Sequence, residues 1–214
     1  MQVLLRLMKL ILGLFLCSFG IIVMIRGGVG YSPWEVFHVG IAKTVGLTLG
    51  TITIGVGVVV VSVVFFMGEK LGLGTLANMI LIGVFIDWIN SFHFIPTAQN
   101  LGVGMGMFLI GMTVAAFGTY LYIASGFGAG PRDSLMVAVT RRTHLPVGVC
   151  RAMIEVSVTV LGYFLGGMVG IGTILCALLL GPMLQAIFRM THFDPEKIRH
   201  ETIMDTWKSL RQQV

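Results

Sequence analysis

Residues 101–124 read LGVGMGMFLIGMTVAAFGTYLYIA and contain no charged side chain over 24 positions. A run of about 18 or more apolar, uncharged residues is typical of a helix that crosses a lipid bilayer. The whole chain has the same character, because 56% of its 214 residues are hydrophobic and 11% are charged, against about 45–50% and about 25% in soluble domains. The sequence therefore predicts an all-α, polytopic transmembrane helical bundle and excludes a water-soluble domain.

This segment belongs to the second copy of an internal repeat. When the chain is aligned with itself at an offset of 98 residues, the two copies match without a gap. The spacing Gly-x-Gly-x-x-Pro begins at Gly28 and again at Gly126, and Gly-x-Gly-Thr begins at Gly72 and again at Gly170. Conserved spacing of glycine and proline is a specific repeat signal, whereas matching apolar residues are common in any membrane protein. We expect two tandem copies of one structural unit.

Each copy is predicted to hold three membrane spans and one short, non-spanning helix. The expected spans are residues 7–25, 51–67, 73–89, 103–124, 147–165 and 171–188. The short helices, residues 33–44 and 131–142, would each rise only about 18 Å, too little for a hydrocarbon core about 30 Å thick. The two copies would then have inverted orientations. The predicted organisation is a first membrane repeat (1–98), a second membrane repeat (99–190) and a cytoplasmic amphipathic tail (191–214).

The basic residues indicate which side faces the cytoplasm. In the six-span arrangement the N-terminus lies on the same side as four arginines, Arg132, Arg141, Arg142 and Arg151. The positive-inside rule then places both termini in the cytoplasm, and it accounts for the net charge of +5 without a nucleic-acid partner. Arg26 and Lys43 are exceptions, so charge counting does not decide whether the short helices cross.

The residue types that carry enzyme chemistry do not form recognisable groups. The three cysteines and five histidines are scattered, with no pair at metal-ligand spacing. No serine, cysteine or histidine stands beside a candidate base. The sequence therefore predicts no metal site, no cofactor and no enzymatic activity.

The glycine-rich loop before the second short helix is a candidate binding site. Its residues are Gly126, Gly128, Gly130, Arg132 and Asp133. Free amide groups at a helix N-terminus, with a basic side chain beside them, favour a small anionic solute. The alternative is a packed turn, in which Asp133 only caps its helix, as Glu35 would in the first copy through a capping box with Ser32.

A pair of opposite charges inside a predicted span is a second candidate. Arg151 and Glu155 are one helical turn apart, near the middle of residues 147–165. A charge at that depth costs at least about 2.5–3.5 kcal/mol on insertion scales and is a functional candidate by default. Two interpretations remain open: a structural ion pair, or part of a polar pathway for a proton, an ion or an anionic solute.

The repeated motifs resemble those of a known family. They are GVGYSPWE at 28–35, GFGAGPRD at 126–133, GLGT at 72–75 and GIGT at 170–173, and they are similar to motifs of the YczE/YyaS/YitT family of bacterial membrane proteins. The resemblance runs to about Arg189, but Trp34 and Glu35 depart from it, standing where the second copy has Arg132 and Asp133. It implies a bacterial inner-membrane protein and no particular activity.

Repeats, interrupted helices and a charged pair at membrane depth together favour a transporter of a small solute or ion. The main alternative is a membrane-embedded regulatory or scaffolding protein without substrate flux. Glycines at helix-packing spacing, such as Gly102 and Gly106, would also suit a homo-oligomer. A wet cavity distinguishes the first function from the second.

Overall fold

The computed structural model describes residues 2–69 and 71–194, which form eight helices and no strand. The helices are α1 (Gln2–Arg26), α2 (Pro33–Val45), α3 (Leu49–Phe66), α4 (Leu73–Ser91), α5 (Leu101–Ala124), α6 (Pro131–Thr143), α7 (Val147–Phe164) and α8 (Ile171–Met190). Within the described residues, six are long and apolar enough to cross a membrane, namely α1, α3, α4, α5, α7 and α8. The predicted all-α fold is confirmed for these residues, and the number of candidate spans agrees with the six that were expected. The predicted amphipathic tail lies, beyond Asp194, outside the described residues.

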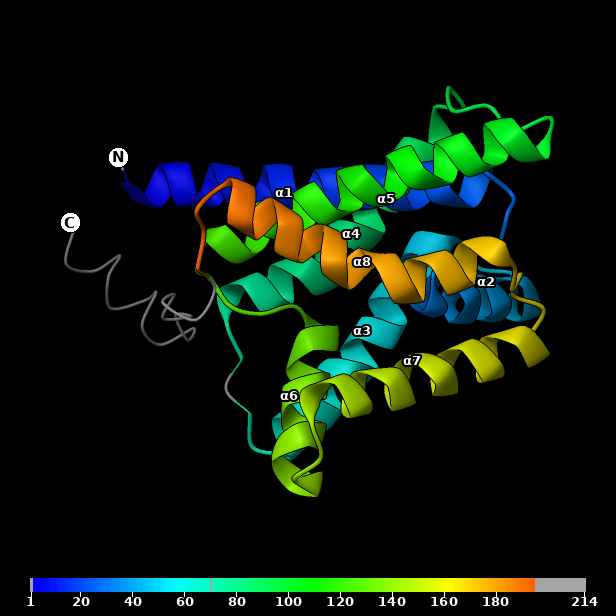
Figure 1. Cartoon of the computed structure of the whole chain (residues 1–214). Coiled ribbons are helices and arrows are strands. Elements are labelled where there is room, and N and C mark those ends of the chain that lie inside the picture. The colour runs from blue at the N-terminus through cyan, green and yellow to red at the C-terminus, as the bar shows by residue number, and fades with distance from the viewer. Residues whose placement is uncertain (1, 70, 195–214) are drawn as a thin grey trace.

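The long helices α1 and α5 lie side by side along one edge of the bundle, at the top of the view in Figure 1. Glycines set their separation: a Cβ atom at Gly13 would lie 2.6 Å from the Tyr122 amide nitrogen, and one at Gly118 would lie 2.6 Å from the Gly13 carbonyl oxygen. Without side chains at these positions the two backbones approach closely, as is common between membrane helices. Ser18 of α1 also donates a hydrogen bond to the Ile82 carbonyl of α4 at 3.2 Å.

Both ends of the short helix α2 contact one connection, residues 165–168, between α7 and α8. Before α2 begins, the Tyr31 amide donates to the Met168 carbonyl at 3.1 Å. At its other end, the Thr44 hydroxyl donates to the Leu165 carbonyl at 3.3 Å. A helix whose two ends meet the same short connection does not carry the chain across the bundle.

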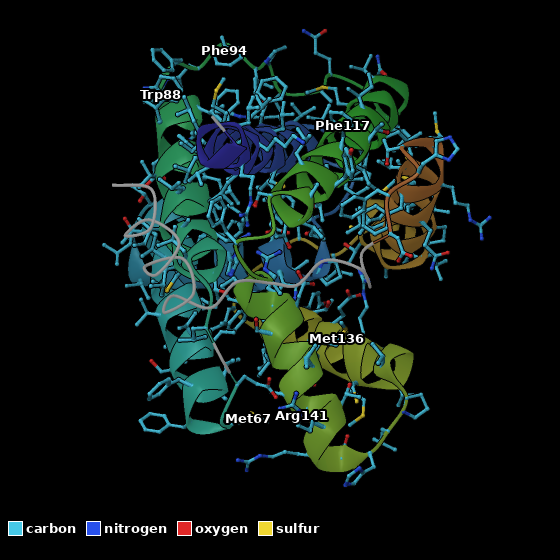
Figure 2. The ribbon with its side chains drawn as sticks, turned by 90° about the vertical axis from the view of Figure 1, so that its left-hand side faces the viewer. Met67, Trp88, Phe94, Phe117, Met136 and Arg141 are labelled. Atoms are coloured by element: carbon cyan, nitrogen blue, oxygen red, sulfur yellow. The ribbon has the colours of Figure 1, made fainter. Side chains whose placement is uncertain are left out.

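The short helix α6 is held in a similar way by the connection between α3 and α4 and by the first turn of α4. Just before α6, the Phe127 carbonyl accepts a hydrogen bond from the Gly74 amide at 2.7 Å. In its last turn, Arg141 pairs with Glu69 at 3.0 Å, and Figure 2 shows Arg141 on the same side of the molecule as Met67. The two connections lie at opposite ends of the bundle (Figure 1), so α2 and α6 occupy opposite ends.

This arrangement makes a prediction for labelling. In a variant without native cysteines, a cysteine at Ser91 or Val169 should react with a membrane-impermeant maleimide from one side only. A cysteine at Leu145, in the α6–α7 connection, should react only from the other side. Both sets of positions are exposed, so access is decided by sidedness. Labelling of Ser91 and Leu145 positions from the same side would contradict six spans with two non-crossing helices.

Candidate functional site: a charged central cavity

A cavity of about 230 Å³ lies inside the bundle and is lined by residues from all eight described helices. Five of the seven residues predicted as a binding site line it: Gly130, Arg132, Asp133, Arg151 and Glu155. Gly126 and Gly128 are not among its lining residues. The structure therefore brings the two candidate sites of the sequence, on α6 and on α7, to one place.

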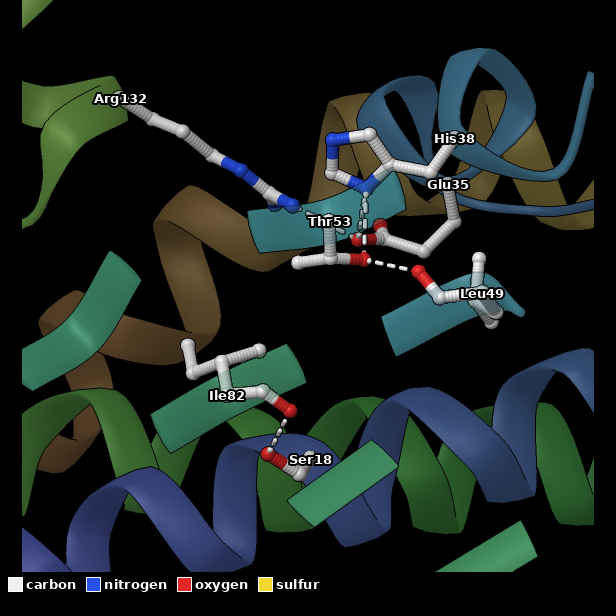
Figure 3. A network of polar contacts seen from close by, with 7 residues as sticks. All are labelled: Ser18, Glu35, His38, Leu49, Thr53, Ile82 and Arg132. Atoms are coloured by element: carbon white, nitrogen blue, oxygen red, sulfur yellow. Dashed lines mark hydrogen bonds and ion pairs between the residues drawn. The ribbon is translucent and has the colours of Figure 1, made fainter. Parts of the chain in front are cut away.

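The first polar contact joins the two short helices. Arg132, in the first turn of α6, reaches Glu35, in the first turn of α2, with an Nη2–Oε1 distance of 2.8 Å (Figure 3). The Glu35 side chain is 4% exposed and that of Arg132 is 37% exposed. The Arg132 guanidinium also lies 5.0 Å from the centre of the Trp34 ring, a favourable cation–π position. A carboxylate so deeply buried needs such a partner.

His38 extends this contact along α2. Its Nδ1 atom lies 3.8 Å from Glu35 Oε1 and 3.5 Å from the Thr53 hydroxyl of α3. Thr53 in turn donates to the Leu49 carbonyl at 2.8 Å (Figure 3). Burial lowers the pKa of His38 well below its ordinary value and the nearby Arg132 charge lowers it further. His38, which lies outside the six spanning helices, is therefore a neutral hydrogen-bonding group near neutral pH.

Asp133 has different surroundings. Its carboxylate accepts a hydrogen bond of 2.6 Å from the Tyr122 hydroxyl of α5. None of the ion pairs found among the described residues includes Asp133. The amide-bearing Asn78 of α4 lines the same cavity. Asp133 is thus a carboxylate without a cationic partner at a polar part of the wall.

Arg151 and Glu155 form the ion pair predicted from their spacing on α7. The Nε–Oε1 distance is 2.8 Å, and the two side chains are 40% and 18% exposed. Both side chains line the cavity.

This ion pair makes a stability prediction. Glu155→Leu leaves the Arg151 charge without its partner, whereas Glu155→Leu with Arg151→Met removes both charges. The single variant should therefore melt at a lower temperature than the double variant. The difference is expected to be moderate, because the pair is partly exposed in the cavity. Thermal unfolding in detergent measures it, and equal melting temperatures would contradict a pair coupled across the cavity wall.

The glycine-rich loop before α6 packs against other segments of the same protein. The Thr75 hydroxyl donates to the Ala129 carbonyl at 2.6 Å, and a Cβ atom at Gly128 would lie 2.9 Å from the Gly72 Cα. Gly128 has a φ of +123°, which favours glycine. At its start, Arg6 donates to the Ser125 carbonyl at 2.8 Å. The loop thus forms a packed turn up to Ala129, and only Gly130 reaches the cavity.

The capping interpretation of Glu35 needs correction. The Ser32 side chain makes no capping hydrogen bond to the described residues, so the expected capping box with Glu35 is not formed. Glu35 turns instead toward Arg132 and His38. The sequence feature that could have identified Glu35 as a functional candidate is an ionisable side chain within an otherwise apolar segment. His38 and Tyr122 gave no pattern of their own, because their partners lie on other helices.

Comparisons with known proteins agree with the sequence motifs. Residues 4–189 match the model described as "Family of unknown function (DUF6198)". The chain is 38% identical over 192 residues to an "Uncharacterized protein" of Haemophilus influenzae, covering 88% of this chain and 87% of that protein. It is 35% identical over 175 residues to "Uncharacterized membrane protein YczE" of Bacillus subtilis, covering 81% and 80%.

A third relative is "Uncharacterized protein YyaS" of Bacillus subtilis, 27% identical over 179 residues, which cover 83% of this chain and 89% of YyaS. No solved structure matches the chain. The resemblance to YczE and YyaS expected from the motifs is confirmed. The chain is therefore a membrane protein that belongs to the family of unknown function DUF6198.

Proposed function

We propose that the protein transports a small solute or ion across the bacterial inner membrane through the central cavity. The observation that carries this proposal is the cavity itself, which gathers two arginines and three carboxylates inside a bundle of six candidate spans. Charged groups are expensive at membrane depth and are retained where they serve a pathway. A scaffolding protein without substrate flux would not need such a cavity.

The proposal includes an inverted repeat, in which residues 1–98 and 99–190 are related by a pseudo-twofold axis in the membrane plane. Contacts between the halves support it because they occur in pairs at the repeat offset. The Gly74 amide donates to the Phe127 carbonyl at 2.7 Å, and the Gly172 amide donates to the Val29 carbonyl at 2.8 Å. Inverted repeats with a site at their interface are a common transporter architecture.

In this mechanism α2 and α6 act as the two gates. Each lies at one end of the bundle and is held by an interhelical connection from the other half: Lys43 donates to the Gly166 carbonyl at 3.0 Å, and Arg141 pairs with Glu69 at 3.0 Å. The Glu35–Arg132 pair joins the inner ends of both helices. Release of one gate opens the cavity to one side while the other stays closed. The proposed topology places both the N- and the C-terminus in the cytoplasm.

The charge of the solute depends on which charged side chains of the cavity lack a partner. A small anion, as expected from the glycine-rich loop, would need Arg132 or Arg151, and each of these already pairs with a carboxylate at 2.8 Å. An anionic solute therefore has to displace Glu35 or Glu155. A cationic solute or a proton meets an excess of carboxylates. The screen for transport must include both signs of charge.

The test is electrogenic flux in proteoliposomes, screened against small organic and inorganic anions and cations. Arg132→Gln should abolish the flux of any solute that the parent protein carries, because it breaks the contact between the gates. Arg142→Gln is the matched control, since Arg142 is an exposed residue of the same helix and does not line the cavity. Absence of flux for every solute with folded protein would favour the regulatory or scaffolding alternative. Equal flux in both variants would refute the role of Arg132.

A further inference from the structure

A second cavity opens from the side of the bundle, between α3 and α7. It is a groove of about 640 Å³ with an almost entirely apolar lining that includes Phe37, Ile52, Val59, Leu135, Val139 and Met153. Among the described residues, α3 packs along α4 and α6, and α7 packs along α2 and α6, but α3 and α7 form no extended contact with each other. The Ser157 hydroxyl in the groove donates to the Met153 carbonyl at 2.7 Å, so it is already satisfied.

The groove and the central cavity share a wall. Four residues line both: Trp34 of α2, Val56 and Val60 of α3, and Ile154 of α7. On the outer side, Val59 is 63% exposed and Met153 is 54% exposed, and both belong to candidate spans. The groove therefore lies between the lipid-facing surface of α3 and α7 and the charged cavity, which adjoins it along this shared wall. A ligand that fills both spaces has an apolar part and a polar part.

The charges of the cavity indicate the polar part. Arg132 and Arg151 are each paired with a carboxylate at 2.8 Å, whereas Asp133 accepts only the Tyr122 hydroxyl among its recorded contacts. With His38 neutral, the lining holds one more carboxylate than guanidinium groups. A positively charged group restores neutrality in a site where an unpaired charge is costly.

We propose that the solute is a single-chain amphiphile with a cationic ammonium head group. The head group lies in the cavity beside Asp133, and the hydrocarbon chain lies in the groove between α3 and α7. This inference rests on the proposed transport function and specifies its substrate class. The cavity, at about 230 Å³, is smaller than most ligand sites, which start at about 300 Å³, so it suits an ammonium group better than a large head group. The chain gains little free energy over bilayer lipid, so the groove accommodates it and the head group selects it.

Two glycines offer a matched steric test. Gly55 of α3 lies in the groove, and Gly106 lies on α5 outside both cavities. A Cβ atom at either position would meet no described atom within 4 Å. Gly55→Phe should therefore fill the groove without disturbing the fold, and Gly106→Phe should place the same side chain elsewhere. Asp133→Asn tests the head group separately.

The readout is quenching of Trp34 fluorescence, because Trp34 lines both spaces and is 8% exposed. The protein, with Trp88→Phe and Trp207→Phe, is placed in nanodiscs of phosphatidylcholine. The probes are dodecylammonium and dodecyl sulfate that carry the same nitroxide on the chain. We expect the ammonium probe to quench Trp34 more strongly than the sulfate probe. Gly55→Phe should lose this quenching, Gly106→Phe should keep it, and Asp133→Asn should lose the preference for ammonium.

Equal quenching by the two head groups in the parent protein would overturn the inference, as would unchanged quenching in folded Gly55→Phe. The comparison of the two head groups uses the parent protein alone, so it remains decisive if Gly55→Phe does not fold. Flux of a small water-soluble solute without Trp34 quenching would leave the transport function standing and refute the amphiphile. Quenching without flux of the same ammonium amphiphile would refute transport and leave only a binding site.

Discussion

Replacement of Gly20 by leucine is expected to prevent assembly of the bundle. A Cβ atom at Gly20 would lie 2.7 Å from the Ala115 amide nitrogen and would also clash with the Gly111 carbonyl oxygen. Both neighbours are backbone atoms of α5, which cannot turn away as a flexible side chain can. Helices α1 and α5 would have to separate, and the loss of stability should exceed the roughly 1–3 kcal/mol typical of overpacking. The measurement is the yield of monodisperse protein in size-exclusion chromatography.

Gly106→Leu is the control for this variant, since Gly106 lies on the same helix α5 with no described atom within 4 Å of an added Cβ. It should be recovered at the parental yield. A Gly20→Leu protein that elutes and melts like the parent would contradict the close approach of α1 and α5.

The second large effect is expected at Glu35. Glu35→Leu leaves the Arg132 guanidinium beside a buried apolar surface, because Glu35 is its partner at 2.8 Å and is 4% exposed. Removal of one member of a buried ion pair typically costs about 3–5 kcal/mol, and the partial exposure of Arg132 places this variant near the lower value. Glu35→Leu combined with Arg132→Leu should recover most of the stability, since no unpaired charge remains. Thermal unfolding and flux are measured on the same preparations.

Glu69→Leu provides the comparison. Glu69 also pairs with an arginine of α6, and its own side chain is 12% exposed, but that arginine, Arg141, is 69% exposed. Because water screens the guanidinium, this pair should contribute less than a buried one, on the order of 1 kcal/mol. If Glu35→Leu and Glu69→Leu lower the melting temperature equally, or if the double variant is no more stable than Glu35→Leu, the Glu35–Arg132 contact has no special role.

Hydropathy was sufficient to predict the spans, because a run such as Leu101–Ala124 has no other stable environment than lipid. The short helices begin at Pro33 and Pro131, as the sequence predicted, since proline suits the first helical turn. They end one residue later than expected, where Gly46 and His144 adopt left-handed caps. The ends of these helices depend on local residue types, so the sequence predicted them to within one residue.

The contacts within the site could be predicted only in part from the sequence. Arg151 and Glu155 could be paired in advance, because a separation of four residues places two side chains on one face of a helix. Glu35 and Arg132 are 97 positions apart in the chain, and their contact depends on how α2 and α6 approach from opposite ends of the bundle. The residues around Glu35 fit a capping box, so the sequence predicted a local role for Glu35 and missed its contact with Arg132. The groove between α3 and α7 likewise reflects two helices that form no extended contact with each other among the described residues, and no local pattern encodes this.

The central claim, a cavity that solutes reach from both sides of the membrane, is tested most directly by a cysteine at Asn78. Asn78 lines the cavity, and in a variant without native cysteines it would provide one thiol at that point. A small, membrane-impermeant methanethiosulfonate is added either to right-side-out or to inside-out vesicles. The control is a cysteine at Val160, which is 47% exposed on the candidate span α7 and lines neither cavity. We predict modification of the Asn78 position in both vesicle preparations and no modification of the Val160 position. Modification of the Asn78 position from neither side, or from one side only, would contradict a transport pathway through the cavity.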